Sequence, residues 1–348
     1  MLNTVTADLL KVSAHQVGNK TNGDNLFLSS EPLDISDDTL NGLLRTFFLS
    51  GFKTPEFYTF TFSNDDHTMN PLFRYATQLF EEPDYFHKAS EHLARHLFEI
   101  SVHPQIKGGD LFVAYLSGVE VENERVDAIG IFKSENRQSF LKLDSARDTF
   151  ALHYDDGISI DKLDKGCLIF NTNKDNGYKV CIVDRANKNE EAQYWKQDFL
   201  QLRPLADNFH HTREFLSIAK NYVSKQLTED FTVSKADQID LLNRSVDYFK
   251  KNDRFDKNEF EEQVFQNQQV IQSFRNFDNT YRQNFDVEIG EQFDISPDAV
   301  KKQSRLFKSV LKLDKNFHVY IHGNREMIEQ GVDENGRKFY KLYYDNES

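Results

Sequence analysis

The sequence predicts an α+β protein with two parts. The first is an N-terminal mixed region with a mainly antiparallel sheet, and the second is a mostly helical C-terminal region ending in a small β element. Short apolar and aromatic runs separated by turn residues recur between 104 and 184, as is typical of antiparallel strands. The helical patterns are grouped elsewhere instead of alternating with these strands, which disfavours a doubly wound parallel sheet. After about Leu205, apolar residues recur at helical spacing.

The length of 348 residues favours two domains, because single cores stop growing near about 250–300 residues. We expect domains at 1–205 and 206–348, with the boundary near 200–208, where Pro204 interrupts the chain. Only 39% of the residues are apolar, but 31 Phe and 14 Tyr can still build a core.

The N-terminal half predicts strands at 4–12 and 57–62 with a helix between them. That helix begins at the Ser36-Asp37-Asp38 cap. Its apolar face consists of Leu40, Leu43, Leu44, Phe47 and Phe48. A second helix is expected over 84–100, where apolar residues recur every three or four positions and form one buried stripe.

A β region follows that helix. Gly108-Gly109 lies after Pro104 and is expected to be a turn, with a phosphate cradle as the less favoured alternative. The expected strands are 110–117, 126–132, 139–143 and 178–184.

The C-terminal region begins with a helical stripe at Phe215, Ile218, Ala219, Tyr222 and Val223. The next helix starts at a capping box formed by Ser234 and Asp237. A further short helix starts at Ser296, a cap residue followed by Pro297 at position N1, and runs to about 306. The closing strands are expected at 307–313, 317–322 and 338–344.

Composition excludes several classes of protein. No stretch approaches the roughly 18–20 uninterrupted apolar residues of a membrane span, and no basic segment followed by an apolar one opens the chain. We therefore expect a soluble cytoplasmic protein that makes no membrane contact. Cys167 and Cys181 form no CxxC pair and are expected to be reduced core thiols.

The sequence predicts no catalytic residue, no metal and no cofactor. It contains no G-x-x-x-x-G-K-[ST] loop, no G-x-G-x-x-G after a strand and no G-x-S-x-G elbow. His92 and His96 have metal-ligand spacing on a helix, but Leu93 stands where the zinc-protease motif needs its glutamate. The pairs His210-His211 and His318 with His322 show no third ligand.

One segment differs from the acidic background. The whole chain has a net charge of −14, but between 301 and 315 six basic residues accompany a single acidic one. The six are Lys301, Lys302, Arg305, Lys308, Lys312 and Lys315. Phosphate contact, more with a duplex backbone than by stacking on single strands, is the functional interpretation; a solvated charged face is the alternative.

The chain resembles the bacterial 37-kDa nucleoid-associated protein family, the YejK-like proteins. Short matching segments follow one another in the family's order over nearly the whole length. They are His15-Gln16, Asp84-Tyr85-Phe86 with Ser90, Leu97 and Pro104, Gly108-Gly109, Ile160-Asp161, 194–199, the Phe215 helix, 237–248, Leu313 and Asn316-Phe317. The resemblance implies association with the nucleoid, DNA binding and contact with type II topoisomerases, and it implies no catalytic residue.

We therefore expect a non-enzymatic nucleoid-associated protein that binds double-stranded DNA, largely without sequence specificity, through the basic segment. The alternative is an adaptor recruited to the nucleoid by a type II topoisomerase or another DNA-bound partner, with little direct DNA contact. An unrecognised hydrolase is a third hypothesis, and it would need a convergent carboxylate or histidine cluster in a pocket. The sequence leaves open whether the chain forms a homo-oligomer.

Overall fold

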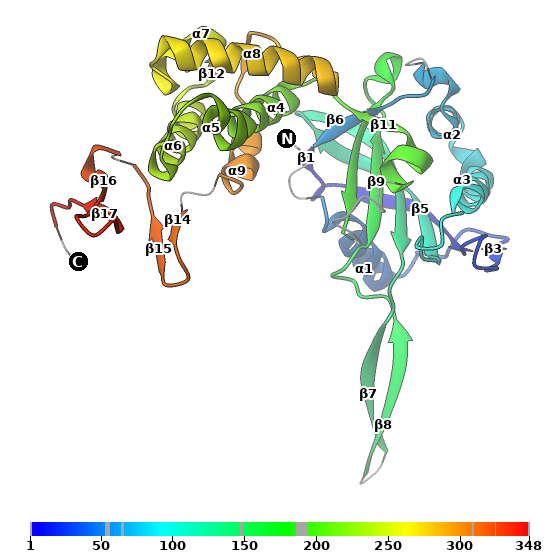
Figure 1. Cartoon of the computed structure of the whole chain (residues 1–348). Helices are drawn as coiled ribbons and strands as arrows, with labels where there is room; N and C mark the ends of the chain where they lie inside the picture. The colour runs from blue at the N-terminus through cyan, green and yellow to red at the C-terminus, as the bar shows by residue number, and fades with distance from the viewer. Residues whose placement is uncertain are drawn as a thin grey trace. The chain divides into compact units, whose positions relative to one another are not determined.

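The structure, a computed structural model of the chain, describes residues 2–52, 56–63, 66–146, 149–185, 194–307, 310–323 and 325–346. The chain divides into two compact units: unit 1, Met1–Leu205, and unit 2, Ala206–Ser348. Unit 1 contains a mainly antiparallel sheet with helices, and unit 2 is mostly helical and ends in short strands (Figure 1). The predicted α+β class is therefore confirmed.

The main sheet of unit 1 has nine strands in the order β11-β4-β10-β9-β6-β5-β2-β3, with β1 paired to β5. Every pairing in it is antiparallel. The strands are β1 Leu2–Asn3, β2 Asp8–Val17, β3 Leu26–Leu28, β4 Phe57–Phe60, β5 Gly109–Val121, β6 Glu124–Ser134, β9 Lys165–Phe170, β10 Lys179–Asp184 and β11 Leu202–Pro204. The β5–β6 hairpin closes through Glu122 and Asn123, both at positive φ (51° and 71°), as a two-residue type I′ turn requires.

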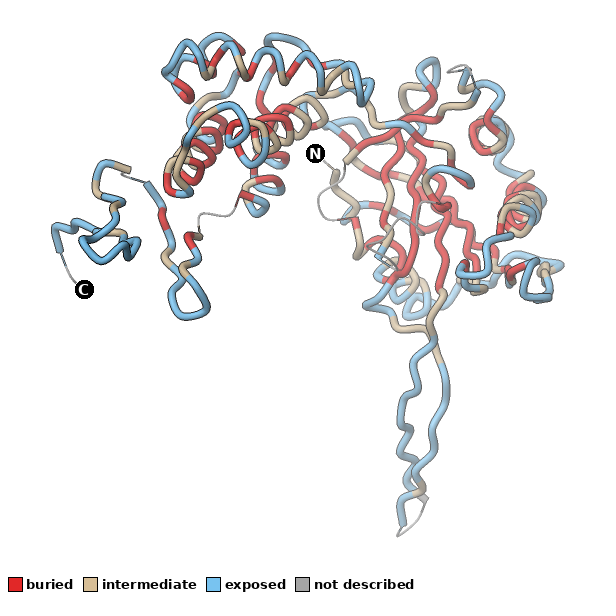
Figure 2. The backbone as a smooth tube through the Cα atoms, in the orientation of Figure 1, coloured by how far each residue is buried: buried red, intermediate tan, exposed pale blue. Residues whose placement is uncertain are grey.

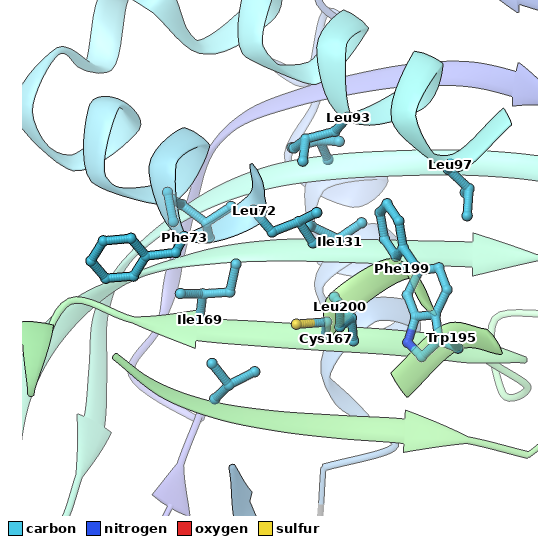
Figure 3. Close-up of a cluster of buried hydrophobic side chains, with 14 of the residues drawn as sticks. Leu72, Phe73, Leu93, Leu97, Ile131, Cys167, Ile169, Trp195, Phe199 and Leu200 are labelled. Atoms are coloured by element: carbon cyan, nitrogen blue, oxygen red, sulfur yellow. The ribbon is translucent and has the colours of Figure 1, made fainter. Parts of the chain in front are cut away.

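Helices cover both faces of this sheet. One core contains α1 (Asp38–Leu49), and the other contains α2 (Pro71–Glu81), α3 (Phe86–Ile100) and the π-helical turn η6 (Tyr194–Leu200). Successive residues of β5 alternate between the two cores, with Leu111 in one and Phe112 in the other. Figure 3 shows the core below α2 and α3, where Leu72, Leu93 and Trp195 converge on the sheet. The central strands are consequently buried on both sides (Figure 2).

One expectation about unit 1 needs correction, and one expected strand is present but lies outside the main sheet. The apolar face expected on α1 is only partly buried: Phe47 and Phe48 enter the core, but Leu40 and Leu43 are each 43% exposed. The strand expected at 139–143 is part of the longer β7 (Gln138–Ala146), which pairs with β8 (Thr149–Gly157) in a separate two-stranded ribbon. Its alternating pattern therefore does not mark a strand of the main sheet.

The two cysteines lie on neighbouring strands but on opposite faces of the sheet. Cys167 of β9 belongs to the core under α2 and α3, and Cys181 of β10 belongs to the core under α1. Both thiols are free and fully buried, which confirms the prediction of core cysteines. Burial raises the pKa of both thiols, so neither is a ready nucleophile.

Unit 2 is built around an aromatic core. Phe215 packs within 4.2–6.0 Å, between ring centroids, of Phe249, Phe255, Phe260 and Phe274. The predicted capping box of α6 is present, since Ser234 and Asp237 exchange side-chain and backbone hydrogen bonds. The helical elements are α4 Asn208–Asn221, the π turn η7 Tyr222–Gln226, α5 Leu227–Asp230, α6 Lys235–Lys251, α7 Lys257–Val264, α8 Gln268–Phe285 and α9 Pro297–Ser304.

Short antiparallel pairs complete unit 2. They are β12 Arg254–Asp256 with β13 Gln292–Asp294, β14 Val310–Leu313 with β15 Phe317–Tyr320, and β16 Ile328–Val332 with β17 Lys338–Leu342. The strands expected at 307–313, 317–322 and 338–344 correspond to β14, β15 and β17, and β16 was not expected. Leu311, Ile321 and Ile328 form a small second core with Ala236 and Ile239 of α6.

His15 of β2 is held neutral between the sheet and α3. Its Nε2 lies 2.9 Å from the Ser90 hydroxyl, and its Nδ1 accepts a hydrogen bond from the Ser29 amide. Burial, followed by the neighbouring charge of His87, lowers the pKa of His15 to about 4, although Glu91 opposes the shift.

We predict that unit 1 loses stability as the pH falls from about 6.5 to 4. In this window the unfolded His15 binds a proton that the native one does not, so native stability falls. Between pH 7 and 5 the loss from His15 is about 2 kcal/mol. Urea unfolding, followed by the fluorescence of Trp195, the single tryptophan, should show this decline, and H15Q should remove about 2 kcal/mol of it. H153Q, at an exposed position of the ribbon, should keep the decline; a wild-type slope in H15Q would contradict the assignment.

Candidate nucleic-acid interface

Three of the six predicted residues lie at the C-terminal end of α9. The helix begins at Ser296, whose hydroxyl accepts a hydrogen bond from the Ala299 amide, with Pro297 in its first turn. Val300 and Phe307 anchor this segment in the aromatic core. Lys301, Lys302 and Arg305 are exposed beside that anchor, so packing fixes their backbone while their charges reach solvent.

Lys302 also meets residues of α4, against which α9 packs. Lys302 is exposed as a residue, yet its Nζ lies 5.5 Å from the ring centroid of Phe209. Loss of hydration, followed by the positive charge of Arg213, lowers the pKa of Lys302. Lys302 and Arg213 thus bring two positive charges together where α9 meets α4, and Arg213 also pairs with Glu214.

Two more of the six lie on the β14–β15 hairpin. Leu311 points toward α6, so its neighbour Lys312 points to the opposite, exposed face, across from His318. Lys315 is exposed in the turn, which passes through Asp314 at φ 51°. Tyr320, 65% exposed, lies on the same outer face as Lys312. Lys308, the sixth residue, falls outside the described residues.

Four of these cations are available to an external anion. Within the described part of the chain, no carboxylate lies within ion-pair distance of Lys301, Arg305, Lys312 or Lys315. In the helical core of unit 2, by contrast, Lys257 and Arg282 both pair with the buried Asp278, at 2.7 Å each. Lys301, Arg305, Lys312 and Lys315 thus keep their charge without a carboxylate partner among the described residues, in a chain of net charge −14.

The structure therefore places the predicted residues on two elements, the end of α9 and the hairpin. Sequence reasoning missed Phe209 and Arg213, which lie about ninety residues earlier in the chain. No local spacing connects them to Lys302, because the pairing of α4 with α9 is a tertiary contact.

The Gly108-Gly109 pair is a close strand contact and the entry to β5. A Cβ on Gly109 would lie 2.2 Å from the Ser134 carbonyl oxygen, so the neighbouring strand requires glycine there. The charged residues that line the adjoining cavity, of about 360 Å³, are Asp24, Asp110, Glu135 and Arg137, and Arg137 is paired with Asp110 at 3.0 Å. Carboxylates repel phosphate, so this cavity is a poor phosphate site.

Unit 1 also contains a buried polar cluster. The Lys133 Nζ donates hydrogen bonds to Glu135 and to the Tyr194 hydroxyl, each at 3.0 Å. Nearby, Lys165 pairs with Asp184 at 2.8 Å, and its Nζ lies 5.0 Å from the Tyr194 ring centroid. Burial lowers the pKa of Lys133 and raises that of Tyr194. The side chains of Lys133 and Glu135 are 1% and 4% exposed, so they join β6 to η6 rather than face a substrate.

The histidines pack against aromatic rings. His92 stacks on Tyr75 at 5.7 Å, whereas His96 packs against Phe199 at 5.6 Å. Among the described residues, no group of three or more His, Cys, Asp or Glu side chains is arranged to hold a metal ion. In the same part of the chain, no helix has both the length and the apolar character that crossing a membrane would require.

The fold and the basic segment can now be compared with known proteins. The family model described as nucleoid-associated protein YejK matches residues 13–346. The chain belongs to this family. The match covers nearly the whole chain, both units included, and confirms the resemblance found in the sequence. No curated protein matches the chain.

We predict that K133M destabilises unit 1 by about 3–5 kcal/mol, because it leaves the Glu135 carboxylate buried without a counter-charge. The double variant K133M/E135L should recover most of this loss. Guanidinium unfolding followed by Trp195 fluorescence measures both variants. K174M, which removes the exposed ion pair with Glu81, is the control and should cost less than about 1 kcal/mol. Wild-type stability of K133M would show that the cluster does not support the fold.

Proposed function

We propose that the chain acts on the nucleoid and binds double-stranded DNA directly, through phosphate contacts made by the basic segment. The contacting groups are Lys301, Lys302, Arg305, Lys312 and Lys315. Membership of a nucleoid-associated protein family supports the cellular setting. The location of the contact rests on the charges of the segment itself.

The observation that carries this proposal is the set of exposed cations without carboxylate partners. Affinity for DNA comes mainly from neutralising phosphates and releasing their counterions. A cation already paired with a carboxylate gains little from phosphate, because it must first lose its partner. Among the described residues, no carboxylate would have to be displaced from Lys301, Arg305, Lys312 or Lys315.

The geometry favours backbone contact over base readout. Recognition helices read base edges with residues near their N-terminus, whereas the basic residues of α9 lie at its C-terminal end. Helix α9 has only eight residues, and its buried Val300 faces the core. Lysine ammonium groups contact phosphates as point charges without selecting a sequence. We infer binding that is largely independent of sequence.

A second candidate function is an adaptor that reaches the nucleoid through a DNA-bound protein such as a type II topoisomerase. Leu40 and Leu43 favour it, because they leave an apolar strip of α1 exposed on unit 1. Such a contact would be nearly insensitive to salt, unlike contact with phosphates.

We predict that binding to a labelled duplex weakens steeply with salt. Five phosphate contacts give a slope of about −4.5 for log affinity against log salt. The helix variant K301E/K302E/R305E should reduce this slope to about −2, and the hairpin variant K312E/K315E to about −3. Fluorescence anisotropy between low and physiological salt measures all three slopes.

The control variant is K250E/K251E, which reverses two exposed lysines at the end of α6. It should retain nearly the wild-type slope. An equal loss in this control would show that net charge, rather than the basic segment, determines binding. Absence of wild-type binding at low salt would overturn direct contact and leave the adaptor function.

A further inference from the structure

The β7–β8 ribbon carries an apolar face that nothing in unit 1 covers. The ribbon pairs only with itself and extends away from the main sheet, and both views show it exposed along its length (Figures 1 and 2). Its register places five large apolar side chains on one face, each between 61% and 76% exposed. They are Leu141, Leu143, Phe150, Leu152 and Tyr154.

The other face of the ribbon is polar. Lys142 lies opposite His153, and Asp144 lies 3.9 Å from Lys142. The one aromatic residue on this face, Phe140, covers Gly157, where an added Cβ would lie 3.0 Å from its ring. The ribbon is therefore amphipathic like a strand pair of a folded sheet, although the described residues of unit 1 supply no layer to pack on it.

Such a ribbon is poorly stable alone. An isolated two-stranded hairpin is marginal in water, and three or more strands or a packed layer are needed for independent stability. Each strand has nine residues and is about 30 Å long, and the apolar side chains occupy roughly 14 Å of it, from the Leu141–Tyr154 pair to the Ser145–Phe150 pair. A contiguous exposed apolar face of this kind marks an interaction site.

We propose that this face packs on the same face of a second copy of the chain, so that two ribbons form a four-stranded, two-layered β structure. The two faces are identical, so a twofold axis brings each apolar side chain against another. Among the described residues of this face, which lie within 141–145 and 150–154, no side chain is charged. It therefore gives no charge complementarity to DNA or to a charged partner, and it is a region where two chains of net charge −14 can approach.

The available area is sufficient for a weak dimer. The two aromatic side chains and three leucines, at exposures of 61–76%, together offer roughly 600 Å² per copy. Two copies would then bury about 1,200 Å², which is the lower end of stable protein interfaces. An interface at this lower end is expected to be weak, with a dissociation constant in about the micromolar range.

Sedimentation velocity of the full chain across a concentration series tests the proposal. The wild type should form a dimer, with little change between low and high salt. Two variants place like charges at the centre of the face: L143K/L152K adds two positive charges, and L143D/L152D adds two negative charges. Each should weaken the dimer at least about a hundredfold, because like charges would meet in an apolar interface. Circular dichroism should show an unchanged fold, since both positions are exposed.

Mixing the two variants gives the decisive result. Opposite charges then face each other, so the mixture should form a heterodimer that neither variant forms as a homodimer. The control K142D/H153D changes the adjacent rung, whose side chains lie on the polar face, and should leave the wild-type dimer intact.

Four outcomes would overturn the proposal. The first is a wild type that stays monomeric at about 100 µM, far above the expected micromolar dissociation constant. The second is a dimer that persists in both charged variants, because such a dimer would form by edge-to-edge pairing or through a distant interface. A third is loss of the dimer in the polar-face control. The fourth is a mixture that stays monomeric, because face-to-face packing requires rescue by opposite charges.

Discussion

The fold of unit 1 depends on burying both faces of its antiparallel sheet. Alternate residues of β5 and β6 enter different cores, so helices must cover both sides. The ring of Phe48 on α1 stacks on Phe132 of β6 at 4.3 Å, and the same ring of Phe132 leaves room only for glycine at Gly130. On the opposite face, Lys133 follows the apolar residues of β6, and Tyr194 of η6 accepts a hydrogen bond from its buried ammonium group. The polar cluster is thus a consequence of two-sided burial.

Most helices and strands were predictable because their periodicity is local. The stripe of α3, the capping box of α6 and the Pro297 start of α9 are signals within one or two helical turns. Helix α2 was missed although its signals are equally local: Asn70 caps it, Pro71 opens it, and its buried residues recur at helical spacing. The strand at 139–143 was predicted correctly, but its sequence does not show that it pairs only with β8 and exposes its apolar face, because the same pattern describes a strand buried in a sheet.

The candidate site was only partly predictable from the sequence, for a similar reason. Charge clustering is a property of the sequence, so the segment from 301 to 315 could be found directly. The structure divides this segment between the end of α9 and the β14–β15 hairpin. This division depends on tertiary packing, because Phe307 enters one core and Leu311 enters another. Arg213 could not be associated with Lys302 by any spacing rule. Cations on separately anchored elements can follow a phosphate backbone over a longer path than one helix would allow.

The anchoring of the closing strands has a consequence for how the protein is made. The side of α6 that presents Ala236 and Ile239 is covered by Leu311, Ile321 and Ile328, and Arg325 pairs with Asp237 at 2.6 Å. The helix is synthesised some seventy residues before these partners leave the ribosome. During translation unit 1 can complete its cores from residues already present, whereas α6 keeps an apolar face open to chaperones and proteases until residue 328 emerges. If translation stopped after α6 but before residue 328, the released chain would contain a folded unit 1 and an α6 whose apolar side is exposed to proteases.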